Sequence, residues 1–275
     1  MTASSASSRL LACRHGDVAW REAGRGLPLV LLHGIGSGAG SWAAQFDDLG
    51  ADFRVLAWDA PGYGDSAPLP MPRPLAADYA VVLAECLGLL GVHELVLVGH
   101  SLGAMIAAAW AAEPSAKLHA LLLASPARGY GGAAPAVRAQ KWQERIDAVE
   151  RLGPAGLAAE RAARLCAPGA PAAAVERVRA QMARITPGGY AQAAHLLAHD
   201  QLAPYLHRVQ APVTVMCGEH DSVTPPDACE AVAREAGAPF VRLAGVGHAC
   251  YVEDPAGFDR ALRTALGPIA GGAAR

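Results

Sequence analysis

Residues 94–112 read ELVLVGHSLGAMIAAAWAA, and this segment indicates the fold class. A run typical of a buried β-strand changes into an alanine-rich run typical of a helix, with the turn Gly99-His100-Ser101-Leu102-Gly103 between them. Such a sharp turn presents Ser101 Oγ at the edge of a sheet, and the backbone makes it only with small residues two positions on either side. Gly-x-Ser-x-Gly alone is a weak signal, because ordinary turns also use these residues. Its place between strand and helix indicates a nucleophile.

The same strand pattern recurs on both sides of this turn. Short apolar runs alternate with longer alanine- and leucine-rich stretches, which predicts an α/β fold with a mostly parallel central sheet flanked by helices. After a long helical interval the strand pattern resumes. The predicted strands are 28–33, 53–59, 94–100, 117–125, 212–218 and 239–245.

The interval between the fourth and fifth of these strands contains no convincing strand of its own. Its apolar residues have helical spacing, and Gly and Pro clusters divide it into separate helices. We therefore predict an inserted helical lid over 127–208, with the α/β core formed by 1–126 and 209–275. The helical spacing is carried by Trp142, Ile146, Val149 and Leu152, and then by Val175, Val178, Met182 and Ile185.

A serine hydroxyl is a poor nucleophile at neutral pH and needs a base, and the base needs an acid that orients it. Asp221 follows the predicted strand 212–218, and His248 follows 239–245. Both side chains should lie on loops at the carboxyl ends of parallel strands, the edge of open α/β sheets where sites gather. The chain order Ser101, Asp221, His248 is the order expected with this kind of serine turn.

Other residues compete for these roles. Some hydrolases place the acid after the strand that follows the nucleophile helix, but this chain has Ser125-Pro126 there. Glu219 and Asp227 are rival candidates for the acid. Three further histidines are expected to be structural: His33, His100 and His220.

The loop His33-Gly34-Ile35-Gly36-Ser37-Gly38 leaves the first of the central strands. Its glycines let backbone amides approach a substrate closely, so the amides of Ile35 and Leu102 are predicted to form an oxyanion hole. The alternative is a phosphate-binding loop. That reading fails because the run matches neither of the two common glycine-rich phosphate motifs.

These residues, with Asp59-Ala60-Pro61-Gly62-Tyr63-Gly64-Asp65-Ser66 and Gly247-His248, resemble the α/β-hydrolase fold-1 family in order and spacing. The resemblance spans the core on both sides of the lid. It implies a triad of Ser101, Asp221 and His248, an oxyanion hole from Ile35 and Leu102, and no cofactor. The family includes esterases, lactonases such as 3-oxoadipate enol-lactonase, carbon–carbon bond hydrolases and cofactor-free haloperoxidases. The stretch after Asp221 is similar to the enol-lactonase group, and serine at 101 argues against the dehalogenase and epoxide-hydrolase branches.

The composition limits the size of the core, the binding partners and the cellular compartment. The 275 residues are 52% hydrophobic and 17% charged, which fits one large core, and the net charge of −2 provides no basic field for nucleic acid or anionic membrane. The six cysteines are scattered without a Cys-x-x-Cys pair, which favours a reducing cytoplasm. We expect no export signal, no membrane span and no bound metal.

Candidate substrate contacts are less specific. Gly34, Trp42, Tyr130, Trp142 and His195 are predicted to line the pocket, although the aromatic residues could equally be core. His195 and His199 are one helical turn apart, but without a third ligand a zinc site is not expected.

The predicted lid is basic. It holds eleven basic and six acidic residues, a net charge of +5, whereas the rest of the chain carries −7. This charge indicates either an anionic substrate drawn under the lid or solvated helix faces.

Four functions remain open on the sequence. The first is hydrolysis of a carboxylic ester or lactone of a small metabolite through an acyl-enzyme on Ser101. A carbon–carbon hydrolase of a vinylogous diketone and a cofactor-free perhydrolase would use the same triad. A non-catalytic ligand receptor on a hydrolase fold is the alternative from another class, because fold alone does not establish activity. The oligomeric state stays open.

Overall fold

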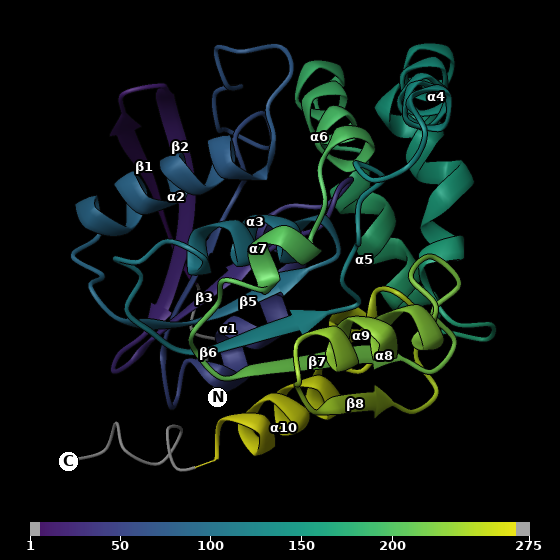
Figure 1. Cartoon of the computed structure of the whole chain (residues 1–275). Coiled ribbons are helices and arrows are strands. Elements are labelled where there is room, and N and C mark those ends of the chain that lie inside the picture. The colour runs from purple at the N-terminus through teal and green to yellow at the C-terminus, as the bar shows by residue number, and fades with distance from the viewer. Residues whose placement is uncertain (1–5, 268–275) are drawn as a thin grey trace.

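The computed structural model describes residues 6–267, whose strands form one eight-stranded sheet (Figure 1). The strand order is β1-β2-β4-β3-β5-β6-β7-β8. From β4 and β3 to β8 the strands run parallel, while β1 pairs antiparallel with β2 and β2 with β4. The predicted α/β fold with a mostly parallel sheet is confirmed. The strands are β1 (Ser7–Cys13), β2 (Gly16–Gly24), β3 (Pro28–Leu32), β4 (Arg54–Trp58), β5 (Leu95–His100), β6 (Leu118–Ala124), β7 (Val213–Gly218) and β8 (Phe240–Leu243).

The predicted strands coincide with β3 to β8. Strands β3 to β7 are short apolar runs that are mostly buried, whereas β8, at the edge of the sheet, is mostly half-buried. The hairpin of β1 and β2 was not predicted. Most of β1 is exposed, and charged residues interrupt the apolar residues of β2, so neither forms a long apolar run. The first five residues, which entered the expectation of no export signal, lie outside the described residues.

Helices cover both faces of the sheet (Figure 1). Side chains alternate between the faces: Val30 and Leu32 of β3 belong to the core under α2, α3 and α8, and Leu29 and Leu31 to the core under α1, α9 and α10. The flanking helices are α1 (Ala43–Leu49), α2 (Ala76–Leu89), α3 (Leu102–Ala111), α8 (Pro226–Glu235), α9 (Cys250–Glu253) and α10 (Pro255–Leu266), with the short 3₁₀ helix η1 (Ala39–Trp42).

The segment between β6 and β7 is helical in the structure. Its long first helix is kinked at Gly153, which has a non-helical φ of 65° and is followed by Pro154. A proline inside a helix removes a backbone hydrogen bond, which explains the kink. Figure 1 shows α4, α5 and α6 grouped beside one end of the sheet. The elements are α4 (Pro135–Arg161), η2 (Ala162–Leu165), α5 (Ala172–Met182), α6 (Pro187–His199) and α7 (Ala203–Leu206).

Of the helices within 6–267, none combines the length and the apolar character needed to cross a membrane.

A buried carboxyl in the contact between α10 and α1 should make stability depend on pH. Asp259 is 1% exposed and accepts a hydrogen bond from Gln45 Nε2 (3.1 Å). Burial, together with the nearby Asp48 carboxylate, raises its pKa from 3.8 to about 7, although Gln45 and Arg263 act in the opposite direction. The folded state therefore holds a proton that the unfolded chain releases, so this contribution to stability is complete below pH 3.8 and is lost as the pH rises to about 7.

We expect Asp259→Asn to gain stability relative to the wild type as the pH rises. The difference in Tm between variant and wild type should grow by on the order of 5 °C between pH 5 and pH 8, because asparagine cannot ionise. Thermal melts across this range measure it, with the exposed Asp227→Asn as a matched carboxylate control whose offset should stay constant. A constant offset for Asp259→Asn as well would contradict the assignment.

Candidate active site

Ser101 lies on a strained turn between β5 and α3. It has φ 54° and ψ −117°, and among residues 6–267 it shares a positive φ with only one other non-glycine residue, Ser125. A Cβ on Gly99 would meet the carbonyl oxygen of Gly103 at 2.5 Å, and one on Gly103 would meet that of Leu32 at 2.5 Å. The small residues around Ser101 are thus required by the close packing of α3 against the strands.

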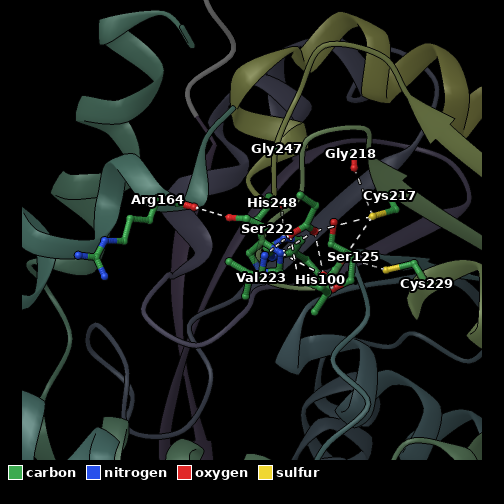
Figure 2. A network of polar contacts seen from close by, with 12 residues as sticks. His100, Ser125, Arg164, Cys217, Gly218, Ser222, Val223, Cys229, Gly247 and His248 are labelled. Carbon is green, nitrogen blue, oxygen red and sulfur yellow. Dashed lines mark hydrogen bonds and ion pairs between the residues drawn. The ribbon is translucent and has the colours of Figure 1, made fainter. Parts of the chain in front are cut away.

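Asp221 and His248 form a buried pair at the ends of β7 and β8. His248 Nδ1 donates to Asp221 Oδ2 at 2.8 Å. The Asp221 side chain is 0% exposed and the His248 side chain is 5% exposed. This bond leaves the other ring nitrogen, Nε2, as the acceptor of the neutral imidazole. The predicted acid and base therefore meet, and Figure 2 shows His248 in the polar network that surrounds them.

The Asp221 carboxylate is held in its charged form. Burial by itself would raise its pKa, but the hydrogen bond and charge of His248 and the hydrogen bonds from Thr224 outweigh burial, so the pKa lies well below the ordinary 3.8. The backbone N–H groups of Val223 and Thr224 donate to Oδ1 at 2.8 and 2.9 Å. A carboxylate so held keeps a fixed orientation and a negative charge beside the imidazole. The rival candidates Glu219 and Asp227 are exposed and belong to no such network.

Thr224 is a member of this network that the sequence analysis did not single out. Its hydroxyl is 2.8 Å from Asp221 Oδ2, 3.1 Å from the carbonyl oxygen of Ser125 and 3.2 Å from His248 Nδ1. The hydroxyl thus ties the acid to the end of β6. The only feature of the sequence that could have indicated this role is that Thr224 stands three residues after the acid.

His100 is closer to the site than expected. Its Nε2–H donates to the carbonyl oxygen of His248 (2.8 Å), and its ring lies 4.8 Å from the His248 ring, centre to centre. Burial, together with the neighbouring His248, lowers the pKa of His100 to about 3, so the ring is neutral near pH 7. His100 therefore supports the loop that carries the base without adding a positive charge beside it.

A cavity of about 290 Å³ opens over Ser101 and His248. Gly34, Ile35 and Tyr130, three of the residues named for the oxyanion loop and the substrate contacts, line it. A Cβ on Gly34 would meet Ser101 Cβ at 2.9 Å and His100 Nδ1 at 3.0 Å, so only glycine lets this loop approach the serine so closely. Leu102, the other predicted oxyanion residue, is the first residue of α3.

Three of the predicted substrate contacts lie outside the cavity lining. Trp42 is fully buried and stacks on Tyr251 (3.8 Å between ring centres), and it is Tyr251 that reaches the cavity. Trp142 packs against His195 and His199, and His195 Nδ1 lies 3.2 Å from the carbonyl oxygen of Pro74. These aromatic side chains are packing residues because helix contacts take up their faces.

Residues 28–255 match the family model described as alpha/beta hydrolase fold. The chain belongs to this family. The match spans β3 to α9 and so includes every element that carries Ser101, Asp221 and His248.

Individual relatives are similar to only part of this chain. A 1-acylglycerol-3-phosphate O-acyltransferase of Rattus norvegicus is 35% identical over 105 residues, which are 36% of this chain and only 29% of the relative. A 2-hydroxy-6-oxo-6-phenylhexa-2,4-dienoate hydrolase of Comamonas testosteroni is 32% identical over 111 residues, 39% of each chain.

Solved structures match nearly the whole chain. A thermophilic esterase from Thermogutta terrifontis has a TM-score of 0.84 at 28% identity and covers 94% of this chain and 97% of its own. An enol-lactonase from Burkholderia xenovorans has a TM-score of 0.81 at 22% identity, covers 94% of this chain and 99% of its own, and supports the fold alone.

Proposed function

We propose that this chain is a serine hydrolase that cleaves a carboxylic ester or lactone of a small metabolite. The observation that carries the proposal is the 2.8 Å bond between His248 and Asp221, in a site where His248 and Ser101 line the same cavity. The similarity to an esterase structure over most of both chains is consistent with it. The predicted cytoplasmic location stays a prediction.

The residues suggest a two-step acyl transfer. His248 Nε2 takes the proton of Ser101 Oγ as the oxygen attacks the substrate carbonyl, and the amides of Ile35 and Leu102 stabilise the resulting oxyanion. The carbonyl re-forms, the C–O bond to the leaving group breaks, and His248 gives its proton to the departing alkoxide. His248 then deprotonates a water, which attacks the acyl-enzyme, and the acid leaves as Ser101 regains its proton.

The helical segment 127–208 is proposed as the lid over this chemistry. Leu165, Val178 and Leu197 from η2, α5 and α6 line the cavity together with the serine and the histidine. Apolar walls of this kind exclude water from an oxyanion. The lid should then decide which acyl group fits.

Carbon–carbon bond hydrolysis is the second candidate, and the similarity to the Comamonas testosteroni hydrolase favours it. It would use the same serine and histidine on a vinylogous diketone. Perhydrolysis and a non-catalytic receptor role have no specific observation in their favour.

The test is the release of p-nitrophenol from acetate, butyrate and octanoate esters by the wild type, followed by product analysis with a lactone and a vinylogous diketone. We expect ester or lactone turnover, with a preference for short acyl groups in a cavity of about 290 Å³. Turnover of the diketone alone would contradict ester or lactone hydrolysis and support carbon–carbon bond hydrolysis. Absence of turnover on the whole panel, with no labelling of Ser101 by a fluorophosphonate, would contradict both.

A further inference from the structure

The wall of the cavity over Ser101 carries positive charge without negative charge. Arg128 and Arg145 are part of its lining, and within the described residues no aspartate or glutamate is. The carboxylate of Asp221, the acid of the proposed triad, is fully buried and bonded to His248. The charge at the cavity is therefore set by the arginines.

In the part of the chain that the structure describes, only one of the two arginines is paired with a carboxylate. Arg128 Nη2 lies 2.8 Å from Glu235 Oε1 in an exposed ion pair. Arg145 is half-buried, and Nη1 donates to the carbonyl oxygen of Lys141 at 2.8 Å, a neutral acceptor one turn back on α4. Within residues 6–267 Arg145 forms no ion pair with a carboxylate.

Glu144, the acid next to Arg145 on α4, does not form an ion pair with it. Glu144 is exposed and is bonded by Lys141 Nζ at 3.1 Å and by Gln140 Nε2 at 2.8 Å. Glu144 contributes nothing to the cavity lining, which Arg145 shares with apolar residues such as Leu165 and Val178. A guanidinium has five N–H donors, so Arg145 keeps donors besides the one that binds the carbonyl oxygen of Lys141, and a carboxylate is the group whose two oxygens match two of them.

We propose that Arg145 is a specificity-determining residue that binds a carboxylate on the acyl part of the substrate, so that the preferred ester or lactone is anionic. This inference rests on the proposed function of the same cavity. It also assigns a use to part of the +5 net charge of the segment 127–208. The triad does the same chemistry on neutral and charged esters, so Arg145 changes only which ester is bound well.

The kinetic test compares two esters with similar acyl chains, 4-nitrophenyl butyrate and the monoanionic 4-nitrophenyl hydrogen glutarate. We expect the wild type to have the higher kcat/KM for the glutarate. Arg145→Gln should lower that value by about 10- to 100-fold through KM and leave the butyrate value nearly unchanged, since a hydrogen-bonded charge pair contributes this much. Arg145→Lys should lose less than Arg145→Gln, because it keeps the charge but not the planar pair of donors.

Arg128→Gln is the matched control, because it removes an arginine that Glu235 already pairs. It should affect the two esters equally. A wild-type preference for butyrate, or an equal loss for both esters in Arg145→Gln, would overturn the proposal.

A binding measurement separates this inference from the proposed function. Glutarate should raise the Tm of the wild type and of Ser101→Ala, the neutral glutaramide should not, and Arg145→Gln should lose the glutarate shift. If no ester is turned over but glutarate still binds through Arg145, the proposed function fails and the anion site stands. If esters are hydrolysed but glutarate gives the same shift with and without Arg145, the anion site fails alone.

Discussion

Ser101→Ala is expected to lower kcat for p-nitrophenyl ester hydrolysis by about 10³- to 10⁶-fold, the range seen when the nucleophile of a serine triad is removed. The residual rate would come from the cavity and the oxyanion amides. Alanine keeps the Cβ that Ser101 already places at φ 54°, so the backbone strain is unchanged and the protein should stay folded. Esterase assays with matched circular dichroism melts measure both properties.

Ser125→Ala is the matched control for this variant. Ser125 also has a positive φ (47°), is fully buried, and its hydroxyl has no hydrogen-bond partner in the described part of the chain. It does not line the cavity, so we expect its removal to leave ester turnover near the wild-type value. Turnover retained by Ser101→Ala and lost by Ser125→Ala would reverse the assignment.

Asp221→Asn should have the next largest effect, a loss of about 10⁴-fold in kcat at neutral pH. An amide in this position can present its N–H₂ to His248 Nδ1, which would favour the tautomer whose Nε2 is protonated and cannot accept the serine proton. It would also remove the negative charge that stabilises the imidazolium formed during the reaction. Because the pKa of Asp221 lies well below 3.8, the wild-type carboxylate stays charged throughout the range from pH 5 to 9.

The rate of Asp221→Asn should rise with pH, because the wrong tautomer leaves hydroxide or a bound water as the alternative base. kcat against pH from 6 to 10 measures this. Asp227→Asn is the control at the start of α8, where the side chain is exposed and makes no contact with His248. The assignment is contradicted if Asp227→Asn loses activity while Asp221→Asn keeps it.

Much of the fold could be predicted from the sequence because the central strands are short, apolar and bounded by turns. The hairpin of β1 and β2 could not, since polar and charged residues interrupt its apolar ones, as expected for a half-exposed sheet edge, and such a pattern resembles a loop. The separate helices between β6 and β7 were predictable from their apolar spacing and their Gly and Pro breaks.

The site shows the same division. Ser101, Asp221 and His248 could be proposed because the topology brings the ends of parallel strands to one edge. The role of Trp42 could not, because whether a large aromatic lines a cavity or packs behind its wall depends on neighbours as distant as Tyr251. The contacts of Thr224 and His100 could not be predicted for a related reason. Their hydrogen bonds join segments that are 24 and 148 residues apart in the chain.

Covalent labelling tests whether Ser101 is a nucleophile activated by His248. The wild type, Ser101→Ala, Ser125→Ala and His248→Ala would be incubated with a fluorophosphonate and analysed by intact mass and peptide mapping. We predict one adduct per chain on Ser101 in the wild type and in Ser125→Ala, none in Ser101→Ala, and a strongly slowed reaction in His248→Ala. An unlabelled wild type, or an adduct on any other residue, would contradict the assignment of Ser101 as the nucleophile.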